Sequence, residues 1–201
     1  MISVLLVDDH PALRAGVVAV LRTEPGVIPV GTAAGPEDLW VQFNRTRPDV
    51  VVLDYHLPGT DGLMVCRQLK LVVPTPAVLI YSAYADAELA IPAMLAGADG
   101  LVHKGVPAHD LSRAIRAVAR GERVLPPVSL ELRSAASERM DAGDQPILGM
   151  ALAGTPPHEI AQTLRIPIDE LDHRLERMIA RLRVEVPAAA RYVIRPAGRE
   201  E

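Results

Sequence analysis

The sequence predicts an α/β domain with a doubly wound, five-stranded parallel sheet, followed by a small all-α domain. Up to about Leu125, short apolar runs rich in β-branched residues alternate five times with longer segments of helical pattern. Continuous apolar strands that alternate with helices indicate a parallel sheet covered on both faces. Pro126 and Pro127 then stop any helix, and from Ile147 onward the pattern is helical throughout.

Each repeat of the first domain contributes one strand and one helix. The strands are expected at Ile2–Val7, Val27–Ala33, Val50–Leu53, Ala77–Tyr81 and Gly100–His103. The helices are expected at Ala12–Glu24, Glu37–Arg47, Leu63–Val72, Asp86–Ala96 and His109–Gly121. Pro92 lies inside the fourth helix, where it removes a backbone hydrogen bond, so we expect that helix to be kinked or short.

The rest of the chain divides into a linker, a helical domain and a tail. We expect the first domain to span residues 1–125, the linker 126–143, the helical domain 144–184 and the tail 185–201. Within the linker, Ser129–Arg139 could form one or two helical turns. The helical domain is expected to hold an apolar segment at 147–152, a turn at 154–157, a short helix at His158–Leu164 and a longer one at Glu170–Leu182.

Composition excludes several classes of protein. Hydrophobic residues make up 49% of the chain and aromatic residues only 3%, so the cores must be aliphatic. The net charge of −4 gives no general attraction to nucleic acid. Cys66 is the single cysteine, which excludes a disulfide framework and a cysteine-based zinc site. The chain shows neither a signal peptide nor a run of roughly 18 apolar residues, so we expect a cytoplasmic protein that has no membrane partner.

Polar side chains follow four of the five expected strands: Asp8 and Asp9 the first, Asp54 the third, Ser82 the fourth and Lys104 the fifth. Strand ends of a doubly wound sheet converge on one crevice. Three carboxylates repel one another unless a cation lies among them, and oxygen ligands suit Mg²⁺. Asp54 could then act as a carboxylate nucleophile toward a phosphoryl donor, with Lys104 and the Ser82 hydroxyl holding the phosphoryl oxygens.

Each of these residues also has a purely structural interpretation. Asp9 or His10 could cap the helix that begins near Pro11, Asp54 could begin a turn, and Lys104 could be a solvated loop charge. Their joint appearance at strand ends favours a functional site over several independent coincidences.

Three segments resemble the signatures of the receiver domain of two-component response regulators, which has a flavodoxin-like fold. They are residues 5–10 (LLVDDH), 54–62 (DYHLPGTDG) and 97–104 (GADGLVHK), and the resemblance covers about residues 1–125. It implies that a sensor histidine kinase phosphorylates Asp54, and that Mg²⁺ is held by Asp8, Asp9, Asp54 and the backbone carbonyl of His56. It also implies no enzymatic activity beyond assisting the domain's own phosphorylation and dephosphorylation.

The resemblance assigns a switch to Ser82 and to residue 101, which lies three positions before Lys104 of the third segment. Receiver domains usually carry an aromatic residue there, which swings inward when the hydroxyl engages phosphate. This chain has Leu101, which can repack but cannot make the same swing. His56 and Tyr84 are bulky residues beside the phosphorylation site, and we expect them to shield a phosphoryl group from water and so lengthen its lifetime.

Residues 147–184 resemble the helix-turn-helix output domain of NarL/LuxR-type regulators. The matching positions are mostly apolar: Gly154, Glu159, Ile160, Ala161, Leu164, Ile166, Leu171, Leu175, Leu182, Arg183 and Val184. The resemblance implies control of transcription through DNA binding and a homodimer in the active state.

The expected recognition helix is unusually acidic at its beginning. Asp169, Glu170 and Asp172 stand where the family usually carries lysines, a threonine and an asparagine, and carboxylates are repelled by DNA phosphates. As a structural alternative, Asp169 and Asp172 fit an N-cap and its return partner. Pro167 stands at the family's usual capping serine, so we expect the helix to begin about two residues late.

Candidate DNA contacts lie further along the same helix, at His173, Arg174, Arg177 and Arg181. The three arginines repeat at helical spacing and could contact phosphates. They could equally pair with acidic neighbours on the helix, Glu170 and Glu176, as an ordinary solvated face. Two functions therefore stay open: a DNA-binding regulator, and a phosphorylation-switched protein-interaction regulator whose output domain has lost ordinary DNA binding.

Overall fold

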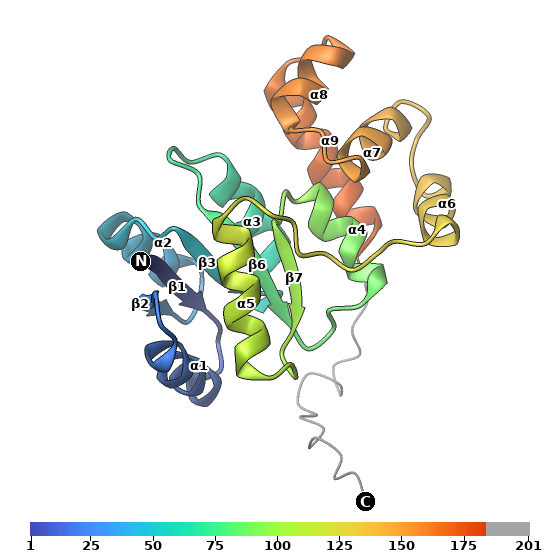
Figure 1. The fold of residues 1–201 in the computed structure, drawn as a ribbon. Coiled ribbons are helices and arrows are strands. Elements are labelled where there is room, and N and C mark those ends of the chain that lie inside the picture. The colour runs from blue at the N-terminus through green and yellow to red at the C-terminus, as the bar shows by residue number, and fades with distance from the viewer. Residues whose placement is uncertain (184–201) are drawn as a thin grey trace, which may run out of the picture.

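The computed structural model describes residues 1–183 and begins with a five-stranded parallel sheet (Figure 1). Its strands are β1 (Ile2–Val7), β2 (Val27–Ala33), β3 (Val50–Asp54), β6 (Ala77–Ser82) and β7 (Gly100–His103), in the order β2-β1-β3-β6-β7. The five expected strands are thus confirmed to within one residue. The strand order reverses between β1 and β3, and a crevice at such a point is the usual ligand site of an open α/β sheet.

Helices cover both faces of the sheet because apolar side chains alternate along each strand. Val4 and Leu6 of β1 belong to the core beneath α1 (Pro11–Thr23) and α5 (Ala108–Ala119). Leu5 and Val7 belong to the core on the opposite face, which is covered by α2 (Pro36–Thr46), α3 (Gly62–Lys70) and α4 (Ala87–Leu95). A short antiparallel hairpin, β4 (His56–Leu57) with β5 (Thr60–Asp61), follows β3. The doubly wound fold is confirmed.

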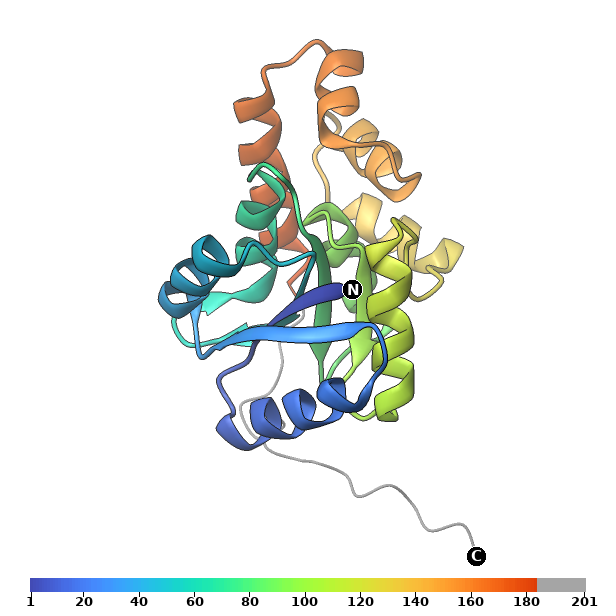
Figure 2. The same ribbon diagram turned by 60° about the vertical axis from the view of Figure 1, so that its left-hand side comes forward.

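Four more helices follow the sheet domain (Figures 1 and 2): α6 (Leu130–Glu138), α7 (Gln145–Leu152), α8 (Pro157–Leu164) and α9 (Ile168–Arg181). Helix α6 lies in the segment expected as a linker, and Ser129 caps it by accepting a hydrogen bond from the Leu132 N–H. Helices α6, α7 and α9 all contact α4, and one apolar core runs from the sheet through α4 into these helices.

Helix α4 is short, as Pro92 predicts, and it is apolar on nearly every side. Leu89, Ala90, Ile91 and Ala93 are each at most 3% exposed. A helix without a polar face must be covered all round, and here the sheet covers one side and the C-terminal helices cover the other. The sequence pattern of α4 therefore encodes the docking of the two halves.

The beginning of α9 corrects one expectation. The helix starts at Ile168, directly after Pro167, rather than two residues later. Proline has no N–H to donate, and the first N–H groups of a helix lack intrahelical acceptors in any case. Asp169 consequently lies in the first turn instead of at the N-cap, where its carboxylate still interacts favourably with the helix dipole.

Two further expectations concern the C-terminal tail and the absence of a membrane span. The tail expected at 185–201 lies outside the described residues, as does Val184. Within residues 1–183, every helix is too short or too polar to cross a membrane.

Candidate phosphoacceptor site

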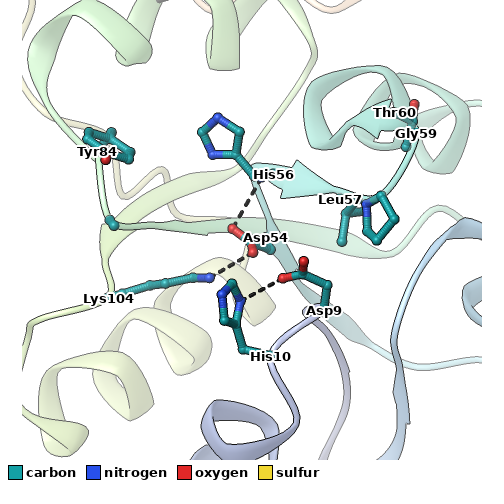
Figure 3. A pocket seen from close by; sticks show the side chains of 11 residues that line it. Asp9, His10, Asp54, His56, Leu57, Gly59, Thr60, Tyr84 and Lys104 are labelled. Atoms are coloured by element: carbon teal, nitrogen blue, oxygen red, sulfur yellow. Dashed lines mark hydrogen bonds and ion pairs between the residues drawn. The ribbon is translucent and has the colours of Figure 1, made fainter. Parts of the chain in front are cut away.

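The carboxyl ends of β1 and β3 bring two buried carboxylates to one lysine, and Figure 3 shows this lysine, Lys104, beside one of the two, Asp54. Asp8 is 1% exposed and Asp54 is 3% exposed. The Lys104 Nζ atom lies 2.6 Å from Asp8 Oδ2 and 2.7 Å from Asp54 Oδ2. The sequence expectation that these three residues converge is met, because β1, β3 and β7 run in the same direction.

Burial changes the acidity of Asp54. Loss of solvent raises the pKa of its carboxyl to about 6, although the Lys104 ammonium opposes this rise. The other Asp54 oxygen, Oδ1, accepts a weak hydrogen bond of 3.3 Å from the His56 N–H. At neutral pH the side chain is mostly ionised but poorly solvated, which is a suitable condition for a carboxylate nucleophile.

The loop after Asp54 folds back closely over its own strand. A Cβ atom on Gly62 would lie 2.1 Å from the Asp54 carbonyl oxygen, so only glycine fits there. The Gly62 N–H donates to the Tyr55 carbonyl at 2.8 Å. Asp61 caps α3 by accepting a hydrogen bond of 2.8 Å from the Leu63 N–H. The motif at 54–62 therefore builds one wall of the site.

A cavity of about 380 Å³ opens over these carboxylates, and its lining includes Asp9, Asp54, His56, Tyr84 and Lys104. Figure 3 shows the His56 and Tyr84 side chains on the far side of Asp54 from Asp9. Their rings make an edge contact with centroids 6.0 Å apart. Both expected shielding residues thus line the cavity that a phosphoryl group on Asp54 would enter.

Oxygen donors suitable for a divalent cation lie at the same place. In residues 1–183, Asp8, Asp9, His10 and Asp54 each offer one ligand atom, and these atoms all lie within 4.8 Å of one another. Three of the four ligands are carboxylates, which Mg²⁺ prefers. The three carboxylates therefore fit the expected magnesium site, and a ring nitrogen of His10 lies beside them.

The two residues expected to form the switch are buried. Ser82 is fully buried at the end of β6, and its Oγ accepts a hydrogen bond of 3.1 Å from the Tyr84 N–H. Leu101 is 5% exposed on β7 and belongs to the core shared with α4. The contact from the Tyr84 N–H uses Ser82 Oγ as an acceptor and does not occupy the hydroxyl hydrogen. A phosphate-holding role for Ser82 stays a prediction.

Most of the charged side chains on α9 are paired within the protein. Arg174 donates to Asp144 at 2.7 Å and also to the Gly143 carbonyl, whereas Glu170 is more distant at 3.9 Å. Arg181 pairs with Asp141 at 2.6 Å. The sequence had offered Glu170 and Glu176 as partners, but the main partners come from the turn before α7.

His173 and Arg177 are the DNA-contact candidates that remain exposed. The His173 ring lies 3.8 Å from a carboxylate oxygen of Glu176. Of the four candidates, these two are therefore best placed for an external partner.

Arg67 of α3 is a residue that sequence reasoning missed. It is 3% exposed, its Nη2 donates to Asp172 of α9, and its Nε atom has no hydrogen-bond partner among residues 1–183. A second ion pair joins the same two halves, with Arg183 Nε 3.1 Å from Asp61 Oδ2. The available signal was an arginine among the apolar residues of α3, because a buried guanidinium requires an acid opposite.

Comparison with known proteins places the chain in a family. Residues 4–116 match the response regulator receiver domain. The chain is 31% identical over 195 residues to the DNA-binding transcriptional activator DevR/DosR of Mycobacterium tuberculosis, covering 92% of this chain and 90% of that protein. It is 30% identical over 198 residues to the nitrate/nitrite response regulator NarL of Escherichia coli, covering 91% and 92% respectively.

Solved structures agree with this match. The response regulator ChrA of a heme-sensing two-component system shares 31% identity and a TM-score of 0.54, with 94% of each chain covered. A LuxR-family response regulator from Aurantimonas shares 31% identity and a TM-score of 0.59, with 70% of this chain and 99% of that chain covered. The chain belongs to the response regulators of two-component systems, in the group that includes NarL and DevR/DosR.

Proposed function

We propose that Asp54 accepts a phosphoryl group from a sensor histidine kinase, and that this modification controls the output helices in the cytoplasm. The observation that carries the proposal is the Asp54 carboxylate, which is buried beside Asp8 and Lys104 at the strand ends. In the reaction, an Asp54 oxygen forms a bond to phosphorus while the phosphorus–nitrogen bond of the donor histidine breaks, which leaves an acyl phosphate and a free imidazole. Most of the catalysis in such a transfer is positioning and charge neutralisation.

The residues divide this work among them. Asp8, Asp9, Asp54 and the backbone carbonyl of His56 would hold Mg²⁺, which supplies positive charge for the transferred oxygens. Lys104 already lies within 2.7 Å of Asp54 and would pair with a phosphoryl oxygen. The Ser82 hydroxyl, whose oxygen accepts from the Tyr84 N–H, would donate its own hydrogen to another phosphoryl oxygen, while Leu101 repacks behind it.

Labelling with acetyl phosphate in Mg²⁺ tests this proposal directly. Wild-type protein should gain one phosphoryl group by intact mass, Asp54→Asn should gain none, and Asp169→Asn should label like wild type because Asp169 lies on α9. Wild-type protein that stays unlabelled, or Asp54→Asn that labels normally, would exclude Asp54 as the acceptor.

We further propose that the receiver domain spans residues 1–125 and acts, through the linker at 126–143, on a DNA-binding output domain that begins near residue 144. Support comes from the relative DevR/DosR, a DNA-binding transcriptional activator, and from the helix pair α8–α9. Phosphorylation would move the Ser82 region next to α4 and weaken the contact between α4 and α9. Two freed output domains in a homodimer would then bind paired half-sites.

One observation favours the protein-interaction alternative. Arg174 and Arg181 are already ion-paired within the domain, and Asp169 and Glu170 are exposed at the beginning of α9. Binding to random duplex DNA at low salt, with and without phosphorylation, separates the two functions. Measurable affinity that rises on phosphorylation supports the DNA-binding regulator, whereas its absence in both states supports the alternative. Molecular mass in solution, measured in parallel, tests the homodimer.

A further inference from the structure

Tyr81 places a phenol at the end of β6, in the core beneath α1 and α5. The residue is 4% exposed, and a tyrosine hydroxyl in such a position needs a hydrogen-bond partner. The hydroxyl donates to the Lys104 carbonyl at 3.1 Å. Burial raises the pKa of the phenol and the Asp8 carboxylate raises it further, so the hydroxyl stays protonated and remains a donor.

The Lys104 peptide lies just beyond the end of the strand ladder. β7 is an edge strand of the sheet, and its pairing with β6 ends at Ser82 and His103. The Lys104 N–H donates to the Ser82 carbonyl at 2.8 Å, and the Tyr81 hydroxyl donates to the Lys104 carbonyl. Both backbone groups of Lys104 are therefore held by consecutive residues at the end of β6.

Lys104 depends on such an anchor because its side chain and the next residue have wide conformational freedom. Its Nζ atom reaches two carboxylates, at 2.6 and 2.7 Å, across a long side chain with many rotamers. Gly105 follows directly, and glycine restricts the backbone less than any other residue. Anchoring matters for the reaction, because a displacement of about 1 Å in a reacting site can lower a rate about a hundredfold.

We propose that Tyr81 is a positioning residue for phosphoryl transfer: its hydroxyl fixes the Lys104 backbone and so directs the ammonium to the phosphoryl oxygens on Asp54. The inference rests on the proposed function, which assigns that task to Lys104. It adds a residue on the opposite face of the sheet from Ser82, since neighbouring side chains of a strand point to opposite faces. The end of β6 would thus act twice, with Ser82 donating to the phosphoryl group directly and Tyr81 acting through Lys104.

Labelling of the full chain with acetyl phosphate in Mg²⁺ tests the inference in Tyr81→Phe, which removes one oxygen and keeps the ring. We expect this variant to label about tenfold more slowly than wild type. Ser112→Ala is the matched control, because it removes a buried hydroxyl of α5 that has no hydrogen-bond partner among residues 1–183. The control should label like wild type, and equal rates for Tyr81→Phe and wild type would overturn the inference.

A double variant shows whether Tyr81 acts through Lys104. Lys104→Met should label more slowly than Tyr81→Phe, and combining the two changes should slow labelling no further. A tyrosine that only stabilised the fold would act independently of the lysine, so the two effects would multiply. Multiplied effects would therefore overturn the inference.

Backbone hydrogen exchange gives a readout that needs no phosphoryl donor. The amides of Lys104 and Val106 should be protected in wild type, because they donate to the Ser82 and His103 carbonyls. In Tyr81→Phe these two amides should exchange several-fold faster, while amides in the middle of β6 keep their rates. Unprotected amides in wild type, or a uniform rise across the sheet domain in the variant, would overturn the inference. This pattern decides the question if Lys104→Met labels too slowly to measure.

Failure of the inference and failure of the proposed function give different results. Wild-type protein that never labels would refute the proposed function and leave the exchange pattern measurable. Wild-type protein that labels, with Tyr81→Phe labelling equally fast, would refute only the role of Tyr81.

Discussion

The ion pair between Arg67 and Asp172 provides a sensitive test of how the two halves are held together. Arg67 projects from α3 into the interface with α9, and its side chain is only 4% exposed, against 19% for Asp172. Within the described part of the chain, Asp172 is the one acid paired with this guanidinium, so replacing it with alanine leaves a buried charge in the docked state. Undocking lets the guanidinium reach water, so we expect Asp172→Ala to favour the undocked state.

The magnitude follows from the burial of the pair. Removing one partner of a buried ion pair costs roughly 3–5 kcal/mol. The lower end applies here, because Asp172 is partly exposed and Arg67 Nε already lacks a hydrogen-bond partner. About 3 kcal/mol changes the ratio of docked to undocked molecules roughly a hundredfold. The apolar contacts of α4 with α7 and α9 oppose undocking and are unaffected by the change.

Small-angle X-ray scattering measures the outcome as the radius of gyration. It should rise in Asp172→Ala and stay at the wild-type value in Asp169→Ala, which removes an exposed acid from the same helix. The double variant Arg67→Met with Asp172→Ala should return to the compact value, because an apolar side chain carries no desolvation cost. If Asp172→Ala scatters and melts like Asp169→Ala, the ion pair does not hold the halves together.

Three further predictions concern the site and the output helices. Because burial raises the pKa of Asp54 from 3.8 to about 6, the native state binds this proton more tightly and loses stability as pH rises from about 4 to 6. In metal-free buffer, the unfolding free energy of Asp54→Asn should therefore exceed that of wild type by up to about 3 kcal/mol at pH 7, and should not exceed it at pH 3.5. Urea denaturation measures this difference, and equal midpoints of the two proteins at pH 7 would contradict the prediction. Replacing His56 or Tyr84 with alanine should shorten the lifetime of the phosphorylated protein several-fold, and unchanged decay of intact mass in both variants would show that they do not shield the acyl phosphate. Arg174→Ala should lower the unfolding free energy of the output helices by about 3 kcal/mol, because it leaves the buried Asp144 carboxylate without its main partner. Arg177→Ala should leave stability unchanged and weaken any DNA binding. Similar melting temperatures of the two variants would argue against this division of roles.

The sheet and its site were readable from local patterns. Apolar runs such as Val50–Leu53 predicted strands directly, because both faces of a parallel sheet are buried and every position must be apolar. The positions of Asp8, Asp54 and Lys104 followed from the same pattern, since carboxyl ends of parallel strands meet at one edge. A site at the strand ends of a parallel sheet can therefore be predicted from the residues that directly follow each strand in the sequence.

Side-chain partners between distant segments were not readable in the same way. Asp172 and Arg67 are 105 residues apart, and the sequence offered Asp172 only local roles. Arg174 had suggested partners on its own helix, yet it pairs mainly with Asp144, thirty positions before it. Acidic and basic residues are common on every helix, so their pairing depends on which surfaces meet.

The sequence alone thus determined the receiver fold, the strand-end chemistry and the helical nature of the C-terminal half, because each depends on short-range periodicity and on one topological rule. Only the tertiary structure decided that α4 is covered by α6, α7 and α9, and that the His10 ring enters the pocket. It alone also decided that Asp172, Arg174 and Arg181 of α9 pair with other segments of the protein. These features depend on the packing of surfaces that are far apart along the chain, for which a linear pattern holds no unique signal.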